Sequence, residues 1–246
     1  MNSNIPAIYY FDNELFLQES DKLFKRIWHF VGFKSDFLND NDFVTLKIAN
    51  TPIVVQNVRG NIKSFLNVCS HRFSIIQQDK CGNRPMVCPY HGWAYDKDGI
   101  PSGIPKKPLF KNFTKGELCE LKLKEFKVSF CGNLCFVSLI DDIDPLHDFL
   151  GDFYKELEMM SLSLGNRIDI NSMEIVANWK VIVENTLESY HVGLVHSETI
   201  AKLEPSGLDF CFDKNNSSWT SSLNISKDKG AYKKIDKYFS PRKYDI

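Results

Sequence analysis

Two short pairs of cysteine and histidine could bind iron in the first half of the chain. Cys69 and His71 form a C-x-H pair, and Cys88 and His91 form a C-x2-H pair, with sixteen residues between the two pairs. A [2Fe–2S] cluster needs four protein ligands, and one variety takes two thiolates on one iron and two neutral imidazoles on the other. Because each pair supplies one ligand of each kind, we expect two loops to hold such a cluster from opposite sides.

The same four residues leave two other interpretations open, a zinc site and unliganded core residues. Two cysteines and two histidines also make a tetrahedral zinc site. Zinc sites usually pair Cys with Cys and His with His at short spacing, whereas both pairs here are mixed. The sequence therefore favours the iron–sulfur cluster. Cys81, which lies between the pairs, is expected to be a small loop or core residue, because free cysteine is often buried as a weak hydrophobe.

A second group of candidate ligands lies on a predicted helix in the second half of the chain. We expect Asn178 to cap this helix, and apolar residues follow it at helical spacing, which predicts one buried face. That face comprises Trp179, Ile182, Val183, Leu187, Tyr190 and Leu194. Glu184, Glu188 and His191 lie on another face, at positions i, i+4 and i+7.

His191 and His196, five residues apart, are the candidate histidine ligands of this segment. On a straight helix two such imidazoles diverge by roughly 140°, since each residue advances by about 100°. We expect the helix to widen or break between them, at Gly193, so that the rings converge. Two histidines and a carboxylate form the facial triad that holds non-haem Fe(II) and leaves positions open for O2. A His-x4-His pair alone is weak support for a metal.

Taken together, the two segments resemble the α subunits of ring-hydroxylating oxygenases, the Rieske non-haem iron oxygenase family. The run CPYHGW, from Cys88 to Trp93, resembles the second cluster loop of that family, and NWK…EN..E.YH….H resembles its mononuclear-iron segment. The resemblance covers most of the chain, from about Phe24 to His196. It implies that Cys69, His71, Cys88 and His91 hold a Rieske [2Fe–2S] cluster and that His191 and His196 hold a mononuclear Fe(II).

The resemblance also implies roles for two neighbouring residues. Glu188 matches the carboxylate that links the two metal sites in the family, and Asn185 falls at a position near the iron in several relatives. In the family the carboxylate of one subunit meets a cluster histidine of the next, in a head-to-tail ring. The resemblance therefore implies a homo-oligomer, a trimer in this family. It also implies a ferredoxin or flavin reductase as electron donor, and a small organic molecule and O2 as substrates.

One feature of the family is not found in the sequence. The family's third iron ligand is a carboxylate, usually aspartate, from a helix late in the catalytic domain. Five aspartates follow His196, and none lies in a context that matches this ligand: Asp209, Asp213, Asp228, Asp236 and Asp245. We therefore expect a C-terminally truncated catalytic domain, with three explanations open: a fragment, one half of a split gene, or a truncated relative that keeps the cluster. The third ligand stays unassigned.

Three functions remain open at this stage. The first is an oxygenase component that passes electrons from the cluster to Fe(II) for hydroxylation, dihydroxylation or oxidative demethylation. The second is a Rieske ferredoxin-like electron carrier, and the third is a truncated subunit without oxygenase activity. The retention of Glu188, His191 and His196 favours the oxygenase.

Composition excludes several other classes of function. The 246 residues carry 30 basic and 31 acidic side chains, a formal net charge of −1, so the chain lacks the basic footprint of a nucleic-acid-binding protein. No stretch approaches the ~20 apolar residues that a membrane helix needs. Seven cysteines, an odd number, fit a reducing compartment, and the N-terminus does not resemble a signal peptide. We expect a cytoplasmic location.

The pattern of apolar residues and the family resemblance together predict an α+β fold in three parts. The apolar pattern indicates an N-terminal helical segment over residues 1–40 and an all-β unit after it. The resemblance implies that residues 41–145 are the Rieske domain and that residues 146–246 are a partial catalytic domain with helices flanking an antiparallel sheet. The expected elements comprise strands near 43–47, 53–55 and 62–66, a hairpin of 126–130 with 135–139 across Gly132-Asn133, one helix over 149–160, and a strand within 217–225.

Overall fold

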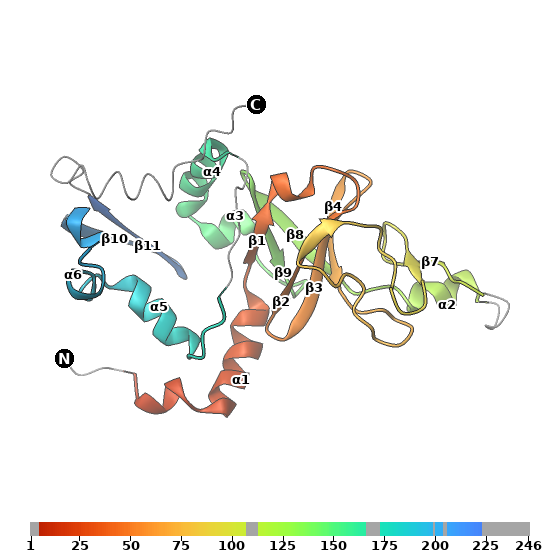
Figure 1. Ribbon diagram of the computed structural model, residues 1–246, viewed down its shortest axis with the longest axis horizontal. Helices are drawn as coiled ribbons and strands as arrows, with labels where there is room; N and C mark the ends of the chain where they lie inside the picture. The colour runs from red at the N-terminus through yellow and green to blue at the C-terminus, as the bar shows by residue number, and fades with distance from the viewer. Residues whose placement is uncertain (1–4, 107–112, 166–172, 199, 204–205, 223–246) are drawn as a thin grey trace. The chain divides into compact units, whose positions relative to one another are not determined.

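The computed structural model describes residues 5–106, 113–165, 173–198, 200–203 and 206–222 (Figure 1). The chain divides into two compact units. The larger unit comprises residues 14–167, and the smaller unit comprises residues 1–13 and 168–246. Helices and strands are both present, so the α+β fold class is confirmed.

The larger unit is built on an antiparallel sheet with the strand order β1-β9-β8-β4-β3-β2-β5. Its strands are β1 (His29–Phe33), β2 (Asp42–Ile48), β3 (Thr51–Val58), β4 (Asn61–Leu66), β5 (Cys81–Asn83), β8 (Glu125–Cys131) and β9 (Leu134–Ser138). The strands predicted from the apolar runs are confirmed. The hairpin is also confirmed, because Cys131 pairs with Leu134 across the two-residue turn Gly132-Asn133.

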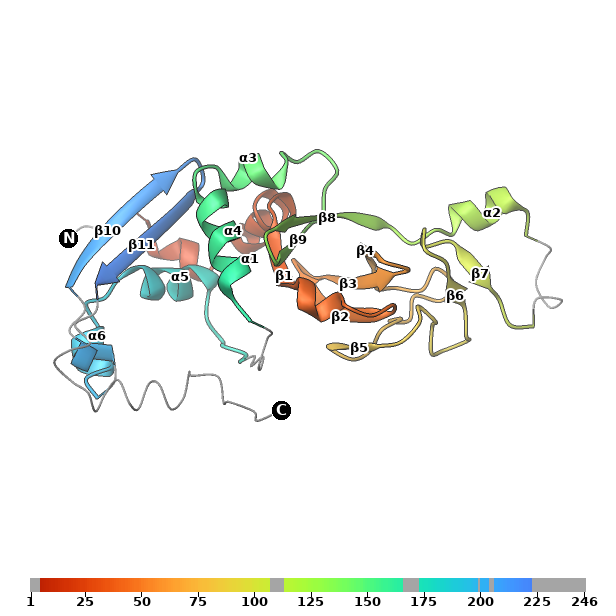
Figure 2. The same cartoon turned by 90° about the horizontal axis from the view of Figure 1, so that it is seen from above.

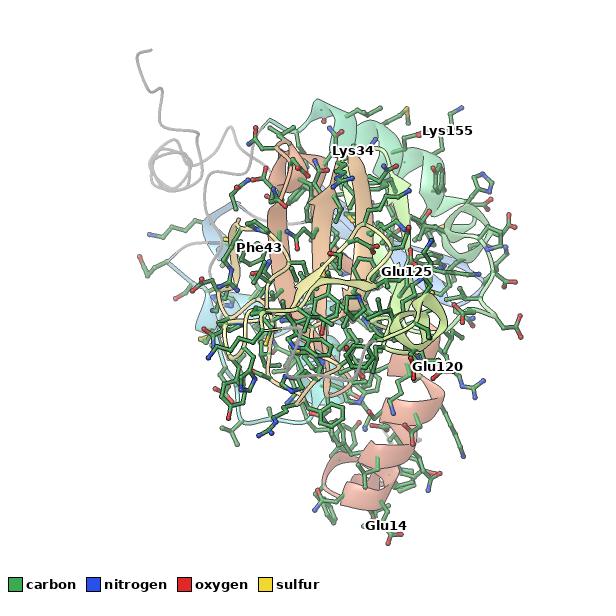
Figure 3. The ribbon with its side chains drawn as sticks, turned by 90° about the vertical axis from the view of Figure 1, so that its right-hand side faces the viewer. Glu14, Lys34, Phe43, Glu120, Glu125 and Lys155 are labelled. Atoms are coloured by element: carbon green, nitrogen blue, oxygen red, sulfur yellow. The ribbon has the colours of Figure 1, made fainter. Side chains whose placement is uncertain are left out.

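Both faces of the sheet are buried against separate cores. Successive side chains of a strand point to opposite faces. We call the cluster of buried side chains that contains Ile53 and Val55 of β3 the first core. The cluster that contains Val54, on the opposite face, is the second core. All three residues are fully buried. Figure 3 labels Phe43, a second-core residue in β2 that is 2% exposed.

The cluster loops extend from one end of this sheet. Residues 67–80 connect β4 to β5, and residues 84–93 connect β5 to β6 (Ala94–Tyr95), which pairs with β7 (Pro101–Gly103). Figure 2 shows β6, β7 and α2 (Lys115–Glu120) together at that end. The second core lies beneath these loops and includes Cys69, Cys88 and Trp93.

Besides α2, the larger unit has helices before, between and after the sheet strands. They are α1 (Asn13–Lys22) and η2 (Phe24–Arg26) before β1, η3 (Lys34–Phe37) between β1 and β2, and α3 (Leu146–Leu150) and α4 (Phe153–Ser163) after β9. The expectation of one helix over 149–160 is wrong, because two helices share this segment. Gly151, with φ of 56°, ends α3 in the left-handed conformation that glycine tolerates.

Gly132 is the position of the larger unit where a side chain is expected to cost most. Its φ is 56°, and a Cβ there would lie 2.1 Å from Ser161 Oγ and 2.8 Å from the Glu158 carbonyl oxygen. We expect Gly132→Ala to lower the free energy of unfolding by more than about 2 kcal/mol, through backbone strain and overpacking against α4.

The control for this prediction is Gly60→Ala. Gly60 has φ of 84°, and a Cβ there would meet no atom within 4 Å beyond its chain neighbours, so only the strain of about 1–2 kcal/mol remains. Urea unfolding of both variants measures the difference. Equal losses at the two glycines would contradict the proposed contact between Gly132 and α4.

The described residues of the smaller unit form short elements. They are η1 (Ala7–Tyr10), α5 (Trp179–Leu187), α6 (Val192–Val195), η5 (Ile200–Leu203) and the antiparallel pair β10 (Ser206–Asp213) and β11 (Asn216–Ser222). Tyr10 Oη donates a 2.6 Å hydrogen bond to Glu184 Oε1, which attaches the N-terminal residues to α5. The Lys180 ammonium lies over the rings of Tyr10 and Trp179.

The buried face predicted for α5 and the residues after it is wrong within the described part of the chain. Ile182, Val183, Leu187, Tyr190 and Leu194 are 39–95% exposed. The physical reason is the size of the elements that the structure describes around them, because a two-stranded sheet and single-turn helices offer too little apolar surface to cover a helix face. No helix among the described residues is long and apolar enough to cross a membrane.

Candidate metal centres

The two cysteine thiols of the cluster motif lie side by side in the second core. Cys69 and Cys88 are each 1% exposed, and neither forms a disulfide. Burial, supported by the neighbouring Cys88 thiol, raises the pKa of the Cys69 thiol. Thiolates are the form that binds iron, so metal binding at this pair has to release protons.

The two histidines lie together at the outer end of the same loops. The ring centroids of His71 and His91 are 4.7 Å apart. His71 stacks on buried Trp93, with 4.8 Å between centroids and 5° between planes, while Tyr90 packs on His91. Desolvation, followed by the charges of His91 and Arg72, lowers the pKa of His71. The neutral imidazole that coordinates iron is therefore favoured at this position.

The two loops fold back on themselves in the same way. The Phe73 amide donates to the Cys69 carbonyl, and the Gly92 amide donates to the Cys88 carbonyl, both at 2.9 Å. Phe73 and Gly92 both have positive φ, 56° and 72°. Each loop thus holds its cysteine inward and carries its histidine toward the tip.

The donor set fits a [2Fe–2S] cluster better than a single ion. The thiols form one pair and the imidazoles another, which is the division that the two irons of a Rieske cluster require. Zinc would need all four donors around one point. Among the described residues, no three His, Cys, Asp or Glu side chains form a group that could hold a single metal ion.

Tyr95 is a residue of this site that sequence reasoning missed. It is 8% exposed, and its hydroxyl donates a 3.1 Å hydrogen bond to Cys69 Sγ while accepting one of 3.0 Å from the Ser70 amide. Burial, followed by the hydrogen bond to Cys69, raises the pKa of the Tyr95 hydroxyl, so the proton stays available for donation. The sequence gives little indication of this role, because a tyrosine two residues after Trp93 is equally typical of an ordinary buried strand residue.

We predict that Tyr95→Phe lowers the reduction potential of the bound cluster. A hydrogen bond to a ligand sulfur stabilises the reduced cluster, which carries one more negative charge. Loss of a bond worth about 1.4 kcal/mol changes the reduction equilibrium about tenfold, ~59 mV for one electron. Redox titration followed by visible absorption measures the shift, with Tyr90→Phe as control because Tyr90 is 60% exposed. Equal potentials in Tyr95→Phe and wild type would contradict the prediction.

His191 and His196 are brought together, but by a different route from the one predicted. Helix α5 ends at Leu187, Glu188 is extended, and the one-turn helix α6 then separates the two histidines. Their ring centroids are 5.4 Å apart. The expected break at Gly193 is wrong, because Gly193 lies inside α6 and the helix ends before Glu188. The Glu188 carboxylate accepts hydrogen bonds from the Tyr190 and His191 amides, which begins the new turn.

The carboxylate of Glu188 also contacts the His191 ring at Nδ1. This hydrogen bond is the largest cause that lowers the pKa of Glu188. Histidine ligands usually donate one ring N–H to such a carboxylate and coordinate through the other nitrogen. Nε2 of His191 therefore remains for a metal. Asn185, by contrast, is exposed on α5, and among the described residues its side chain makes no hydrogen bond to either histidine.

A third iron ligand is not found among the described residues. No group of three candidate donors includes His191 and His196 there. Asp209 and Asp213 lie on β10. Asp228, Asp236 and Asp245 lie outside the described residues.

Comparison with protein families matches both halves of the site. Residues 27–114 match the Rieske [2Fe-2S] domain, and residues 163–238 match the catalytic domain of the ring-hydroxylating α subunit. The chain is 33% identical over 208 residues to the oxygenase subunit of glycine betaine monooxygenase from Chromohalobacter salexigens, covering 81% of this chain and 44% of that protein. It is 31% identical to the large subunit of anthranilate 1,2-dioxygenase from Acinetobacter baylyi, covering 78% and 42%.

Solved structures agree with the fold. The quaternary ammonium Rieske monooxygenase CntA in complex with L-carnitine superposes with a TM-score of 0.76 at 24% identity, over 88% of this chain and 62% of that one. Naphthalene 1,2-dioxygenase from Rhodococcus sp. bound to indole gives a TM-score of 0.68 at 26% identity, over 82% and 48%. The chain spans somewhat less than half the length of the curated relatives it matches.

Proposed function

Because the chain belongs to the Rieske non-haem iron oxygenase α-subunit family, we propose that it acts as the oxygenase component of a multi-component system on a small organic substrate. The observation that carries this proposal is the second histidine pair. His191 and His196 lie with their rings 5.4 Å apart, and Glu188 orients the first of them. A protein that only carries electrons has no use for this arrangement.

The residues would divide the work between two centres. Cys69, Cys88, His71 and His91 would hold the Rieske cluster, and His191 and His196 would hold the mononuclear iron. When bound, the cluster supplies electrons one at a time and the Fe(II) activates O2. The second core keeps water away from the thiols, while the exposed edge of His91 faces solvent at the loop tip, where an electron donor can approach.

Glu188 would connect the two centres in the assembled protein. Its carboxylate holds His191 at Nδ1, and its side chain is still 44% exposed. A cluster histidine of a neighbouring subunit, His71 or His91, could therefore reach the same carboxylate. This arrangement calls for a homo-oligomer, and we propose the trimer of the family, located in the cytoplasm and supplied by a ferredoxin or flavin reductase. Asn185, exposed on α5, is proposed to lie near the iron in that assembly.

The relatives suggest two classes of substrate for a direct test. Glycine betaine monooxygenase and CntA act on quaternary ammonium compounds, whereas anthranilate and naphthalene dioxygenases act on aromatic ones. We would load the protein with Fe(II), reduce it, and admit 18O2 with glycine betaine, L-carnitine, anthranilate or naphthalene. The expected result is 18O in a hydroxylated aromatic product, or O2-dependent dealkylation of a quaternary ammonium substrate to an amine and a carbonyl compound, and either is lost in His191→Ala. With both metal sites filled, the absence of both kinds of product would contradict oxygenase function on these substrates.

The second candidate is a Rieske electron carrier or a truncated subunit without oxygenase activity. It is favoured by one observation, the lack of a third ligand beside His191 and His196 among the described residues. A carrier should bind only the two irons of the cluster. Added Fe(II) should then leave both the iron content and the electron-transfer rate unchanged.

A further inference from the structure

A buried network of amide side chains joins the two cluster loops. Gln77 is 1% exposed and Asn67 is 3% exposed. The backbone N–H of Gln77 donates to Asn67 Oδ1 at 2.9 Å, and Asn67 Nδ2 donates back to the backbone carbonyl oxygen of Gln77 at 2.8 Å. Asn67 precedes Cys69, and Gln77 follows His71. These two hydrogen bonds therefore join the beginning and the end of the first cluster loop, with Cys69 and His71 between them.

The side chain of Gln77 reaches from the first loop to the start of the second. Its Nε2 donates to the carbonyl oxygens of Arg84 at 3.0 Å and Pro85 at 3.3 Å. In the other direction, Arg84 Nε donates to Gln77 Oε1 at 2.9 Å, and Arg84 Nη2 donates to the Ile76 carbonyl at 2.5 Å. Pro85 lies three residues before Cys88, so these bonds fix the segment that carries the second thiol.

Gln56 in β3 anchors this network to the sheet. It is 1% exposed, and its Nε2 donates to the carbonyl oxygens of Arg84 at 2.7 Å and Asn41 at 3.2 Å. Gln77 Nε2 lies 3.3 Å from Gln56 Oε1. Both cluster loops are thus tied to one central strand through fully buried amides.

We infer that Gln77 is a positioning residue for the iron–sulfur cluster. Hydrogen bonds are directional, whereas the apolar contacts of the second core are not, so the amides set the spacing of the loops and the core supplies the cohesion. With that spacing fixed, the thiols of Cys69 and Cys88 face each other before iron arrives. The inference rests on the cluster of the proposed function, and it adds a residue that binds no metal.

The test compares the rate of cluster loss among full-length variants. Cluster bleaching by an iron chelator is followed by visible absorption, and the g-values of the reduced cluster are recorded. Outer-sphere changes at metal sites typically cost about 10–100-fold in affinity, so Gln77→Leu should lose its cluster at least about tenfold faster and shift the g-values. Gln78→Leu is the neighbouring exposed control and should behave as wild type.

A second control separates positioning from general destabilisation. Val137 is fully buried in the first core, remote from the cluster loops, so Val137→Ala should lower thermal stability with normal g-values. If Gln77→Leu loses its cluster no faster than Val137→Ala, the inference is overturned. If Gln77→Leu does not fold, Arg84→Met tests the same network. Arg84 is only partly buried, so we expect this variant to fold. Faster cluster loss in Arg84→Met supports the network, and a wild-type rate overturns it.

The outcomes also distinguish this inference from the proposed function. Wild-type protein without acid-labile sulfide would contradict the cluster itself. A stable wild-type cluster with an equally stable Gln77→Leu cluster would remove only the role of Gln77.

Discussion

Cys88→Ala is expected to abolish the iron–sulfur cluster. The Cys88 thiol is 1% exposed and lies against the Cys69 thiol, so no water-accessible donor can replace it without opening the second core. A [2Fe–2S] cluster with one terminal ligand missing is not retained. Bound iron, acid-labile sulfide and visible absorption should all fall to background in the purified variant.

Cys81→Ala is the matched control for this prediction. Cys81 lies between the two motif pairs in sequence but is exposed on the edge strand β5. Its replacement should leave iron and sulfide at wild-type values. Wild-type sulfide in Cys88→Ala, or equal losses in the two variants, would remove Cys88 from the ligand set.

Glu188→Ala is expected to stop turnover while both metals stay in place at saturating Fe(II). The carboxylate orients His191 through Nδ1 and, in the proposed oligomer, meets a cluster histidine of the neighbouring subunit. Loss of such an outer-sphere carboxylate typically costs about 10–100-fold, and loss of the bridge between centres should add to it. Product formation and iron content are measured on the same preparation.

Glu184→Ala provides the comparison, in α5 just before Glu188. Glu184 lies four residues earlier, is exposed, and is hydrogen-bonded to Tyr10 rather than to a histidine. It should retain activity within about twofold, as expected for a surface side chain. Undiminished turnover in Glu188→Ala, with normal coupling of electrons to product, would count against the bridging role.

The sequence was most informative about two features, the strands of the sheet and the two cluster loops. The strands follow from the alternation of apolar residues, and the loops follow from the types and spacing of the candidate ligands. The alternating apolar residues of β2 to β4 and the Gly132-Asn133 turn predicted the sheet, because burial of strand faces leaves little choice of register. The mixed Cys/His pairs predicted two loops that bring like donors together. Those predictions depend on local chemistry, which a single sequence carries.

Two backbone features could not be read from helical periodicity. The run after Asn178 keeps apolar residues at helical spacing past Glu188, yet the chain leaves the helix there because the Glu188 carboxylate bonds the amides of the next turn. Likewise, Gly151 divides α3 from α4 within a continuous amphipathic pattern. Periodicity reports which face is apolar, and it does not report a competing side-chain hydrogen bond.

The supporting residues of the cluster site were also missed, for a different reason. Tyr95, Gln77 and Gln56 act through hydrogen bonds to partners 7–28 residues away in sequence. A buried glutamine has no local signature that separates it from an exposed one, such as Gln78. Only the three-dimensional pairing shows which amide is needed.

Iron and acid-labile sulfide per chain, measured on anaerobically purified protein with and without added Fe(II), test the central claim most directly. We predict two irons and two sulfides, rising to three irons with Fe(II) and falling back to two in His191→Ala. A count fixed at two irons would contradict the oxygenase and leave an electron carrier. Absence of sulfide would contradict the Rieske cluster itself.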